Sequence, residues 1–266
     1  MKFQEYGQKQ NPAILLLHGG GLSWWNYREA AELLQDRFRI ILPILDGHAG
    51  SDRPFTSIEE NASGIISFID EQLGGSVSLI GGLSLGGQVL LEMMSQRKDI
   101  CSHALVESTA VIPSKLTHAL IAPAFGSSYG LIRRRSFARL QFQSLHIKPE
   151  LFEDYYRDTC WIRKQDMIAF LRANTSYALK DAFPEAAAEV HVCVGEKETR
   201  VILRSAEAIC RMRPACRLHR LPDLRHGEFS INHAARYADF IREIVQGSKF
   251  QFHEETVNEA DNEQGI

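Results

Sequence analysis

The chain has 266 residues, of which 44% are hydrophobic and 24% are charged. This composition is typical of a globular protein with one large core, and the formal net charge of −3 argues against the basic surface of a nucleic-acid-binding protein. The first residues, MKFQEYGQKQNP, lack the apolar core of a signal peptide, and the run Ala13–Leu17 is too short to span a membrane. We therefore expect neither a membrane span nor a nucleic-acid partner.

The cysteines are five in number and widely scattered, without a C-x-x-C pair. An odd count with this spacing indicates neither a disulfide framework nor a zinc site. Free thiols are typical of reducing compartments, so the pattern predicts a cytoplasmic protein. The expected free thiols are Cys101, Cys160, Cys193, Cys210 and Cys216.

Strands and amphipathic helices alternate along the first part of the chain. A short apolar run predicts a strand, whereas apolar residues spaced by three or four predict a helix. In the helix that starts after Ser57, Glu60 completes a capping box and Gly74 ends the apolar stripe. In chain order the predicted elements are a strand Ala13–Leu17, a helix Trp24–Gln35, a strand Arg39–Leu45, a helix Ile58–Leu73, a strand Val77–Ile80, a helix Leu85–Gln96 and a strand His103–Glu107.

The same alternation returns near the carboxyl terminus, with strands Glu189–Val194 and Arg217–Leu221 and helices Val201–Met212 and Ile231–Val245. Strands that alternate with helices form βαβ units, and continuously apolar strands are typical of a sheet covered on both faces. We therefore predict an α/β fold, with a mostly parallel central sheet flanked by helices.

The alternation is interrupted between residues 113 and 184, where the pattern is helical and mixes proline, aromatic and basic residues. A segment of this length is too long for a plain loop. We predict a helical lid, or cap, inserted into a core made of residues 1–112 and 185–247. Residues 248–266 are acidic and poorly periodic, which predicts a disordered tail.

The stretch GGLSLGGQ, from Gly81 to Gln88, lies between a predicted strand and a predicted helix. Glycine weakens both kinds of element, so its concentration here indicates a sharp turn whose backbone needs neighbours without side chains. Ser84, at the centre of the turn, would project from the carboxyl end of the strand, where open α/β sheets bind ligands. A glycine-rich turn with an incidental serine is the alternative.

The pattern G-x-S-x-G, from Gly82 to Gly86, resembles the nucleophile elbow of the α/β-hydrolase family. A serine hydroxyl is a poor nucleophile until a base removes its proton, and in that family the base is a histidine late in the chain. His226 matches, because it follows the last predicted strand and precedes the last predicted helix. The resemblance covers about Ala13 to Val245.

The resemblance also implies an acid after the strand Glu189–Val194, where related chains carry G-x-x-D. The matching residue here is Glu198, which departs from the usual aspartate by one methylene. A solvated loop charge is the alternative role for Glu198. Glu107, at the end of an earlier strand, is the reserve acid because some family members carry the acid on that strand.

Two further stretches carry the resemblance. LLLHGGGLSWW, after the first predicted strand, resembles the family's H-G-x-G loop, which implies an oxyanion hole made by the backbone N–H groups of Gly20 and Leu85. His18 is then a residue that shapes this loop. LDGHAGSDRP, from Leu45 to Pro54, resembles the family's D-x-x-G-x-G-x-S loop, and we expect it to brace the oxyanion loop.

Three side chains are candidate contacts for the substrate. Trp24 follows the oxyanion loop, Phe125 lies among the apolar residues of the predicted lid, and Arg133 begins a run of three arginines, which suit a carboxylate. Packing is the alternative role for the two aromatic residues, and a solvated surface is the alternative for the arginine.

Together these features predict a carboxylesterase-like serine hydrolase that cleaves a small-molecule ester or related acyl bond through an acyl-enzyme, without a cofactor or metal. The same machinery serves C–C bond hydrolysis, thioester cleavage, acyl transfer and lyase reactions, and the fold does not choose among them. Epoxide hydrolases and dehalogenases are disfavoured, because those relatives carry aspartate at the position of Ser84. A non-catalytic sensor of the same fold is the alternative from another class.

Overall fold

The computed structural model describes residues 2–247, except the side chains at 127 and 128. Within these residues the strands form a seven-stranded sheet of order β1-β3-β2-β4-β5-β6-β7, in which only β1 runs antiparallel to its neighbour. The predicted α/β fold with a mostly parallel sheet is confirmed. The strands are β1 (Phe3–Tyr6), β2 (Ala13–Leu17), β3 (Arg39–Pro43), β4 (Val77–Leu83), β5 (Cys101–Glu107), β6 (Glu189–Gly195) and β7 (Arg217–Leu221).

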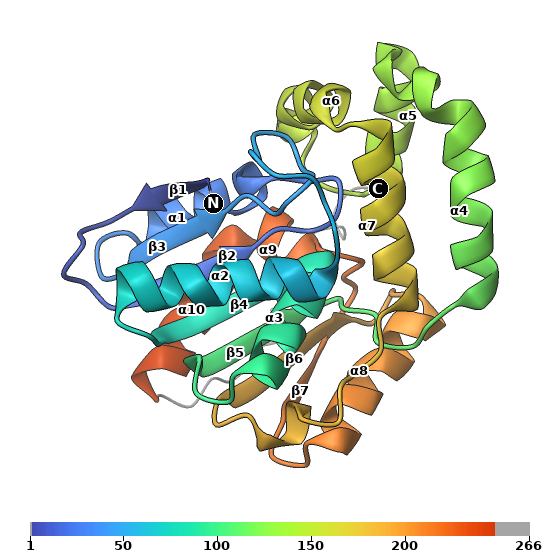
Figure 1. The fold of residues 1–266 in the computed structure, drawn as a ribbon. Helices are drawn as coiled ribbons and strands as arrows, with labels where there is room; N and C mark the ends of the chain where they lie inside the picture. The colour runs from blue at the N-terminus through green and yellow to red at the C-terminus, as the bar shows by residue number, and fades with distance from the viewer. Residues whose placement is uncertain (1, 248–266) are drawn as a thin grey trace, which may run out of the picture.

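Helices cover both faces of the sheet (Figure 1). Successive side chains of a strand point to opposite faces, so Leu15 and Leu17 of β2 join the core under α2, α3 and α8, whereas Ile14 and Leu16 join the core under α1 and α10. Burial of β2 on both faces explains its continuous apolar run. The helices of these layers are α1 (Arg28–Leu34), after the 3₁₀ helix Trp24–Tyr27, α2 (Ile58–Leu73), α3 (Leu85–Gln96), α8 (Arg200–Met212) and α10 (Ala234–Gln246).

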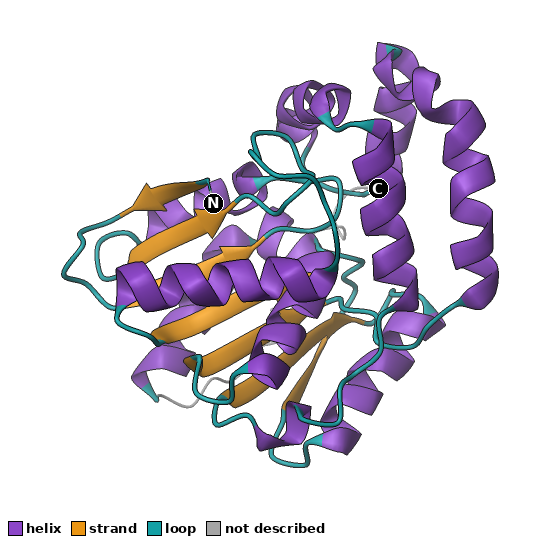
Figure 2. Ribbon diagram, in the orientation of Figure 1, coloured by secondary structure: helices purple, strands orange, loops and turns teal. Residues whose placement is uncertain are grey.

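A group of helices between β5 and β6 stands beyond the end of the sheet to which the parallel strand arrows point (Figure 2). It is tied to the core by Trp25 Nε1, which donates to Asp158 at 2.8 Å, and by the Phe55 amide, which donates to Asp166 at 2.9 Å. These contacts pack the helices between β5 and β6 onto the core. The helices of this group are α4 (Lys115–Ser128), α5 (Arg135–Ser144), α6 (Phe152–Trp161) and α7 (Lys164–Ser176), with 3₁₀ turns at Tyr129–Arg133, Pro149–Leu151 and Phe183–Glu185.

Several element ends are shifted, and the predicted helix Trp24–Gln35 begins as a 3₁₀ helix. Two larger differences concern the ends of the described chain. β1 is an addition, since FQEY is an edge strand without a fully buried residue and has no clear apolar pattern. The predicted final helix is divided at His233 into α9 (Glu228–Asn232) and α10, because His233 has the non-helical angles φ −115° and ψ 47°. Gly247 ends α10 in the left-handed conformation, while the predicted tail 248–266 lies outside the described residues.

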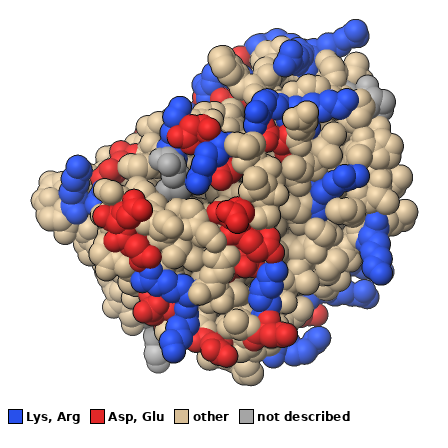
Figure 3. All heavy atoms as spheres, viewed as in Figure 1, with Lys and Arg blue, Asp and Glu red and all other residues tan. Residues whose placement is uncertain are grey.

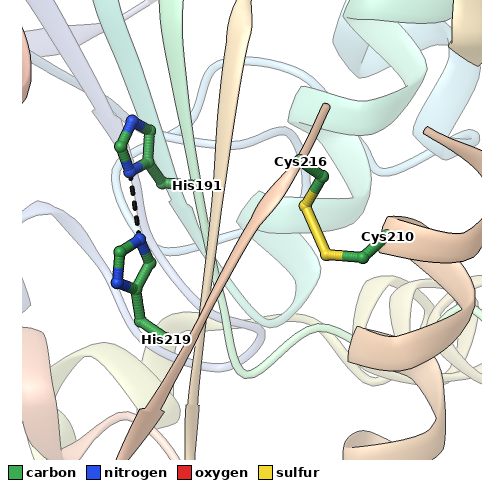
Figure 4. Close-up of a disulfide and its surroundings, with 4 residues drawn as sticks. All are labelled: His191, Cys210, Cys216 and His219. Carbon is green, nitrogen blue, oxygen red and sulfur yellow. Dashed lines mark hydrogen bonds between the residues drawn. A yellow bond between two sulfur atoms is a disulfide. The ribbon is translucent and has the colours of Figure 1, made fainter. Parts of the chain in front are cut away.

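Cys210 and Cys216 form a disulfide, so the expectation of five free thiols is wrong for this pair. A tight turn after α8, closed by a hydrogen bond from the Cys216 amide to the Arg213 carbonyl, brings the two Cα atoms to 5.1 Å. The bond lies on the side of β6 and β7 opposite His191 (Figure 4). The cytoplasmic location, which free thiols favour, stays a prediction.

The surface carries both signs of charge. In the face seen in Figure 3, acidic and basic side chains lie side by side at the left, centre and bottom, whereas basic side chains predominate along the upper and right-hand margin. Among the helices of residues 2–247, none has both the length and the apolar character that a membrane crossing requires.

Candidate active site

Ser84 occupies the turn between β4 and α3, with the unusual angles φ 53° and ψ −110°. Residues with side chains rarely adopt positive φ, and the cost is accepted where the surroundings require it. A Cβ atom on Gly82 would lie 2.5 Å from the Gly86 carbonyl oxygen, and one on Gly86 would overlap the Leu17 carbonyl. The concentration of glycine is therefore a packing requirement of a strand that turns directly into a helix, as predicted.

The end of β5 holds this turn in place. The Ser84 amide donates to the Glu107 carbonyl at 2.9 Å, and the Thr109 hydroxyl donates to the same carbonyl at 2.8 Å. Thr109 also packs against Gly87, where an added Cβ would overlap its Oγ1 atom. These contacts fix the direction in which the Ser84 side chain leaves the sheet.

His226 and Glu198 form a pair, with Nδ1 of the imidazole 3.1 Å from Oε2 of the carboxylate. The Glu198 side chain is only 1% exposed, whereas the His226 side chain is 47% exposed. The two loops that carry them are joined by a hydrogen bond from the Lys197 amide to the Leu224 carbonyl at 3.0 Å, and the close approach of Leu224 leaves no room for a Cβ at Gly195. The pair thus joins the loops after β6 and β7.

Glu107 faces a different partner. Its Oε1 atom accepts a hydrogen bond from the Ser230 amide at 3.2 Å, and it makes no hydrogen bond to His226. Complete burial is the main reason that the pKa of Glu107 rises from 4.5 to about 7. The imidazole therefore contacts Glu198, whereas the reserve acid Glu107 contacts Ser230.

The glycine loop after β2 lies against the start of α3. A Cβ on Gly20 would touch the Leu85 side chain at 3.6 Å, so the two predicted N–H donors come from adjoining segments. Leu85 is the first residue of its helix, where the amide has no partner inside the helix. The amide of Gly21 is already used, because it donates to Nε2 of His48 at 3.1 Å.

Two buried histidines support this loop. His18 Nε2 accepts a hydrogen bond from the Leu45 amide at 3.1 Å, and the His48 ring stacks on Phe170 at a centroid distance of 4.5 Å. Burial is the main cause that lowers the pKa of His18 to about 3 and that of His48 to about 4. Both rings are neutral acceptors at neutral pH, which fits the expected bracing role of the segment Leu45–Pro54.

One cavity of about 320 Å³ is lined by four of the predicted site residues, namely Ser84, His226, Glu198 and Gly20. Ser84 Oγ makes no hydrogen bond to His226 in this structure, and contacts of this kind often tighten only around bound substrate. A second cavity of about 260 Å³ adjoins the first, because Gly20, Leu22, Ser144 and Leu145 line both. The helical insertion supplies part of the wall of each.

The three candidate substrate contacts differ in position. Phe125 lines the second cavity. Trp24 lies outside both cavities and faces a separate open hollow beside Trp161, with the Arg28 guanidinium 4.9 Å from its ring centre. Arg133 is exposed on the insertion above the ring of Tyr129. The expectation of substrate contact therefore has geometric support for Phe125 and none for the other two.

Two contributors to the site were missed from sequence. Ser108 has φ 50°, and its hydroxyl accepts a hydrogen bond from the Gly227 amide at 3.3 Å, which ties the end of β5 to the histidine loop. His146 and Ile147, from the loop after α5, close one side of the first cavity. Neither has a sequence signal, because Ser108 belongs to no motif and the loop is brought near only by the fold.

A sharp serine turn after a central strand, with a histidine and a carboxylate delivered by the loops of two later strands, is the arrangement found in α/β hydrolases. The sequence model of the family described as "Alpha/beta hydrolase family" matches residues 14–240 of this chain. The chain belongs to this family.

Solved structures with the same fold include a lactonase and an esterase. An enol-lactonase from Burkholderia xenovorans superposes with a TM-score of 0.78 at 17% identity, covering 92% of this chain and 96% of that one. A thermophilic esterase from Thermogutta terrifontis has a TM-score of 0.76 at 20% identity, covering 92% and 93%. At these identities the likeness shows the fold alone.

A curated relative matches this chain by sequence over part of its length. Epoxide hydrolase 3 from Xenopus tropicalis is 26% identical over 103 residues, which are 38% of this chain and 28% of that protein. The match therefore spans under a third of the relative's length.

Proposed function

We propose that the protein is a serine hydrolase that cleaves a small-molecule ester through an acyl-enzyme. The observation that carries the proposal is one cavity lined by Ser84, on its strained turn, and by His226, whose Nδ1 atom contacts Glu198 at 3.1 Å. A nucleophile, a base and a group that orients the base are the parts that acyl transfer needs.

In the first half of the proposed reaction, Ser84 Oγ attacks the ester carbonyl carbon while His226 Nε2 takes the serine proton. The carbonyl oxygen becomes an oxyanion, which the backbone N–H groups of Gly20 and Leu85 stabilise. The C–O bond then breaks, and His226 returns the proton to the departing alcohol. Glu198 holds the imidazole and stabilises its charged form throughout.

In the second half, water attacks the acyl-enzyme and His226 takes a proton from it. The bond between the acyl carbon and Ser84 Oγ breaks, the serine recovers its proton, and the carboxylic acid leaves. The residues of this chain account for every proton in the cycle, so the proposal invokes no cofactor.

The size of the cavities supports a small substrate. Pockets for drug-sized ligands are about 300–1,000 Å³, and the cavity beside Ser84, at about 320 Å³, is at the lower limit. The adjoining cavity of about 260 Å³ contains Phe125 and offers a second apolar compartment. We propose that one compartment holds the acyl part and the other the alcohol part.

The helical insertion would act as the lid of this site. Its residues Ser144 and Leu145 line both cavities, so movement of α5 would change access to Ser84. Residues 113–184 as lid, with the rest of the described chain as core, is the domain organisation that this role implies.

Epoxide hydrolysis is not proposed, although a named relative has that activity. Relatives that open epoxides carry an aspartate as nucleophile, and the corresponding turn here carries Ser84. Lactone or C–C bond hydrolysis would use the same serine, and these reactions are distinguished by substrate rather than by machinery.

A fluorophosphonate probe tests the proposal, because it reacts with an activated serine. The native chain should be labelled, Ser84→Ala should not, and Ser144→Ala should be labelled because Ser144 only lines the cavity wall. Absence of label on the folded native chain would overturn the proposal and favour a non-catalytic sensor. A panel of p-nitrophenyl esters with acyl chains of increasing length would then define the substrate, with activity expected to decline for long chains.

A further inference from the structure

Three metal-binding side chains meet on β5 and β6, in the first half of each strand and hence away from the cavity. His103, Glu189 and His191 each offer a ligand atom, and these atoms lie within 4.8 Å of one another. The register puts His103 of β5 opposite Glu189 of β6, and His191 follows two residues later on the same face. They are the one such group found among the residues that the structure describes.

The contacts of His191 give this group a definite arrangement. Its Nε2 atom is 3.1 Å from Oε1 of Glu189, close to the spacing of about 3.3 Å between ligands of a tetrahedral Zn²⁺ ion with bonds of about 2.0–2.1 Å. Its Nδ1 atom is 3.1 Å from Nε2 of His219 on β7 (Figure 4). The two rings are nearly parallel, and both pack edge-on against Phe240 of α10.

The imidazole of His103 leaves one of its nitrogens unpaired within the described structure. This nitrogen, Nδ1, is buried. A buried imidazole nitrogen without a partner is costly, and a metal ion within reach of its ring would offset part of that cost.

We propose that His103, Glu189 and His191 bind one Zn²⁺ or similar transition-metal ion, with His219 orienting His191 from behind. Two imidazoles and one carboxylate are a known ligand set for Zn²⁺. On binding, His191 gives its Nε2 lone pair to the metal and carries its proton on Nδ1, from which it donates to His219. A hydrogen bond of this kind is the usual support of a metal-binding histidine.

Arg217 is the competitor for this site. Its guanidinium contacts Glu189 Oε1 at 2.9 Å, so the metal would displace it from that oxygen. The Arg217 side chain is 63% exposed and the Glu189 side chain 38% exposed, which gives the arginine room to move and the ion a path of entry. Removing the guanidinium should therefore strengthen binding.

The expected consequence is stability rather than catalysis. The ion would link β5 to β6 at the end of the sheet away from Ser84, and a ligand that binds only the folded state raises its stability. Zn²⁺ should raise the thermal midpoint of unfolding and leave ester turnover unchanged. The metal site does not depend on the proposed function. Metal binding and fluorophosphonate labelling of Ser84 are separate measurements, so either can fail without the other.

The experiment measures metal binding to the full chain, without a histidine tag, after treatment with a chelator. Titration with Zn²⁺ by calorimetry should give one site per chain, and Co²⁺ should give the visible absorption of a tetrahedral complex. His191→Ala should weaken binding by more than about 100-fold, because it removes a ligand. His219→Gln should weaken binding by about 10–100-fold, the loss typical when a residue that hydrogen-bonds to a ligand is replaced. Arg217→Ala should bind more tightly. His118, a partly exposed histidine of α4, is the control, and His118→Ala should bind as the native chain does.

Absence of binding to the native chain, or equal binding by His191→Ala, would overturn the proposal. If His191→Ala does not fold, Glu189→Gln at the partly exposed edge replaces it, with circular dichroism as the check on folding. Undiminished binding by a folded Glu189→Gln would likewise exclude this site.

Discussion

Nδ1 of His226 lies 3.1 Å from Oε2 of Glu198, although Glu198 is one methylene longer than the aspartate usual at this position in related chains. The extra methylene is accommodated because the two loops are joined through the Lys197 amide and the Leu224 carbonyl, which sets the spacing between their side chains. A second carboxylate, Glu107, is fully buried nearby and contacts Ser230 instead.

This difference predicts opposite results for two matched substitutions. Glu198→Gln should lower kcat by about 10³–10⁴-fold, because the amide no longer stabilises the charged imidazole. Glu107→Gln should change kcat by less than about tenfold, since it removes no hydrogen bond to His226. Ester turnover by both variants, with circular dichroism as the check on folding, measures this. A large loss in Glu107→Gln alone would assign the triad acid to β5.

The raised pKa of Glu107 predicts how stability varies with pH. The folded chain binds this proton more tightly than the unfolded chain does, so the stabilisation is complete below about pH 4.5 and is lost as the pH rises through about 7. A rise from 4.5 to about 7 corresponds to about 3 kcal/mol. Glu107→Gln removes this dependence.

Urea unfolding of the native chain and Glu107→Gln at pH 5 and pH 8 measures the effect. The buried histidines titrate in both proteins and cancel in the difference between them. The native chain should lose stability relative to the variant between the two pH values, and a constant difference would contradict the prediction.

His48 provides a test of the glycine loop. His48→Phe keeps an aromatic ring beside Phe170 but removes the acceptor for the Gly21 amide, so the neighbouring Gly20 amide should shift. Displacement of a catalytic group by about 1 Å can cost about 10²-fold, and we expect kcat to fall by about 10–10²-fold with a smaller change in KM.

Steady-state kinetics of His48→Phe and His48→Gln separate the acceptor from the packing. Glutamine offers an amide oxygen to Gly21, so it should restore part of kcat. Native kcat in His48→Phe would show that the loop keeps its geometry without this hydrogen bond.

The parts predicted from sequence are those with local causes. The turn at Ser84 was found because close packing excludes a Cβ at Gly82 and Gly86, and the strands because burial on two faces produces apolar runs. Glu198 and His226 were predicted through chain order in a family resemblance rather than through any property of their own neighbourhood, and their catalytic roles stay a prediction.

The parts missed depend on contacts between distant segments. β1 becomes a strand only by pairing with β3, and the bond between Cys210 and Cys216 depends on the turn between α8 and β7. The group of His103, Glu189 and His191 exists only because β5 and β6 are neighbours in the sheet, although the whole helical insertion separates these two strands in the sequence.

Gly87 links the packing of the elbow to stability. A Cβ there would overlap Oγ1 of Thr109 and lie 3.0 Å from the Gly82 carbonyl oxygen, so Gly87→Ala should destabilise the fold by about 1–3 kcal/mol, the usual cost of overpacking. Gly126→Ala in α4 is the matched control, because nothing lies within 4 Å of its added Cβ and alanine favours a helix. Urea unfolding should therefore move the midpoint down for the first variant and leave it level or higher for the second. Equal midpoints for the two variants would mean that Thr109 at the end of β5 moves aside at little cost. The contact between Gly87 and Thr109 would then not fix the direction of the Ser84 side chain.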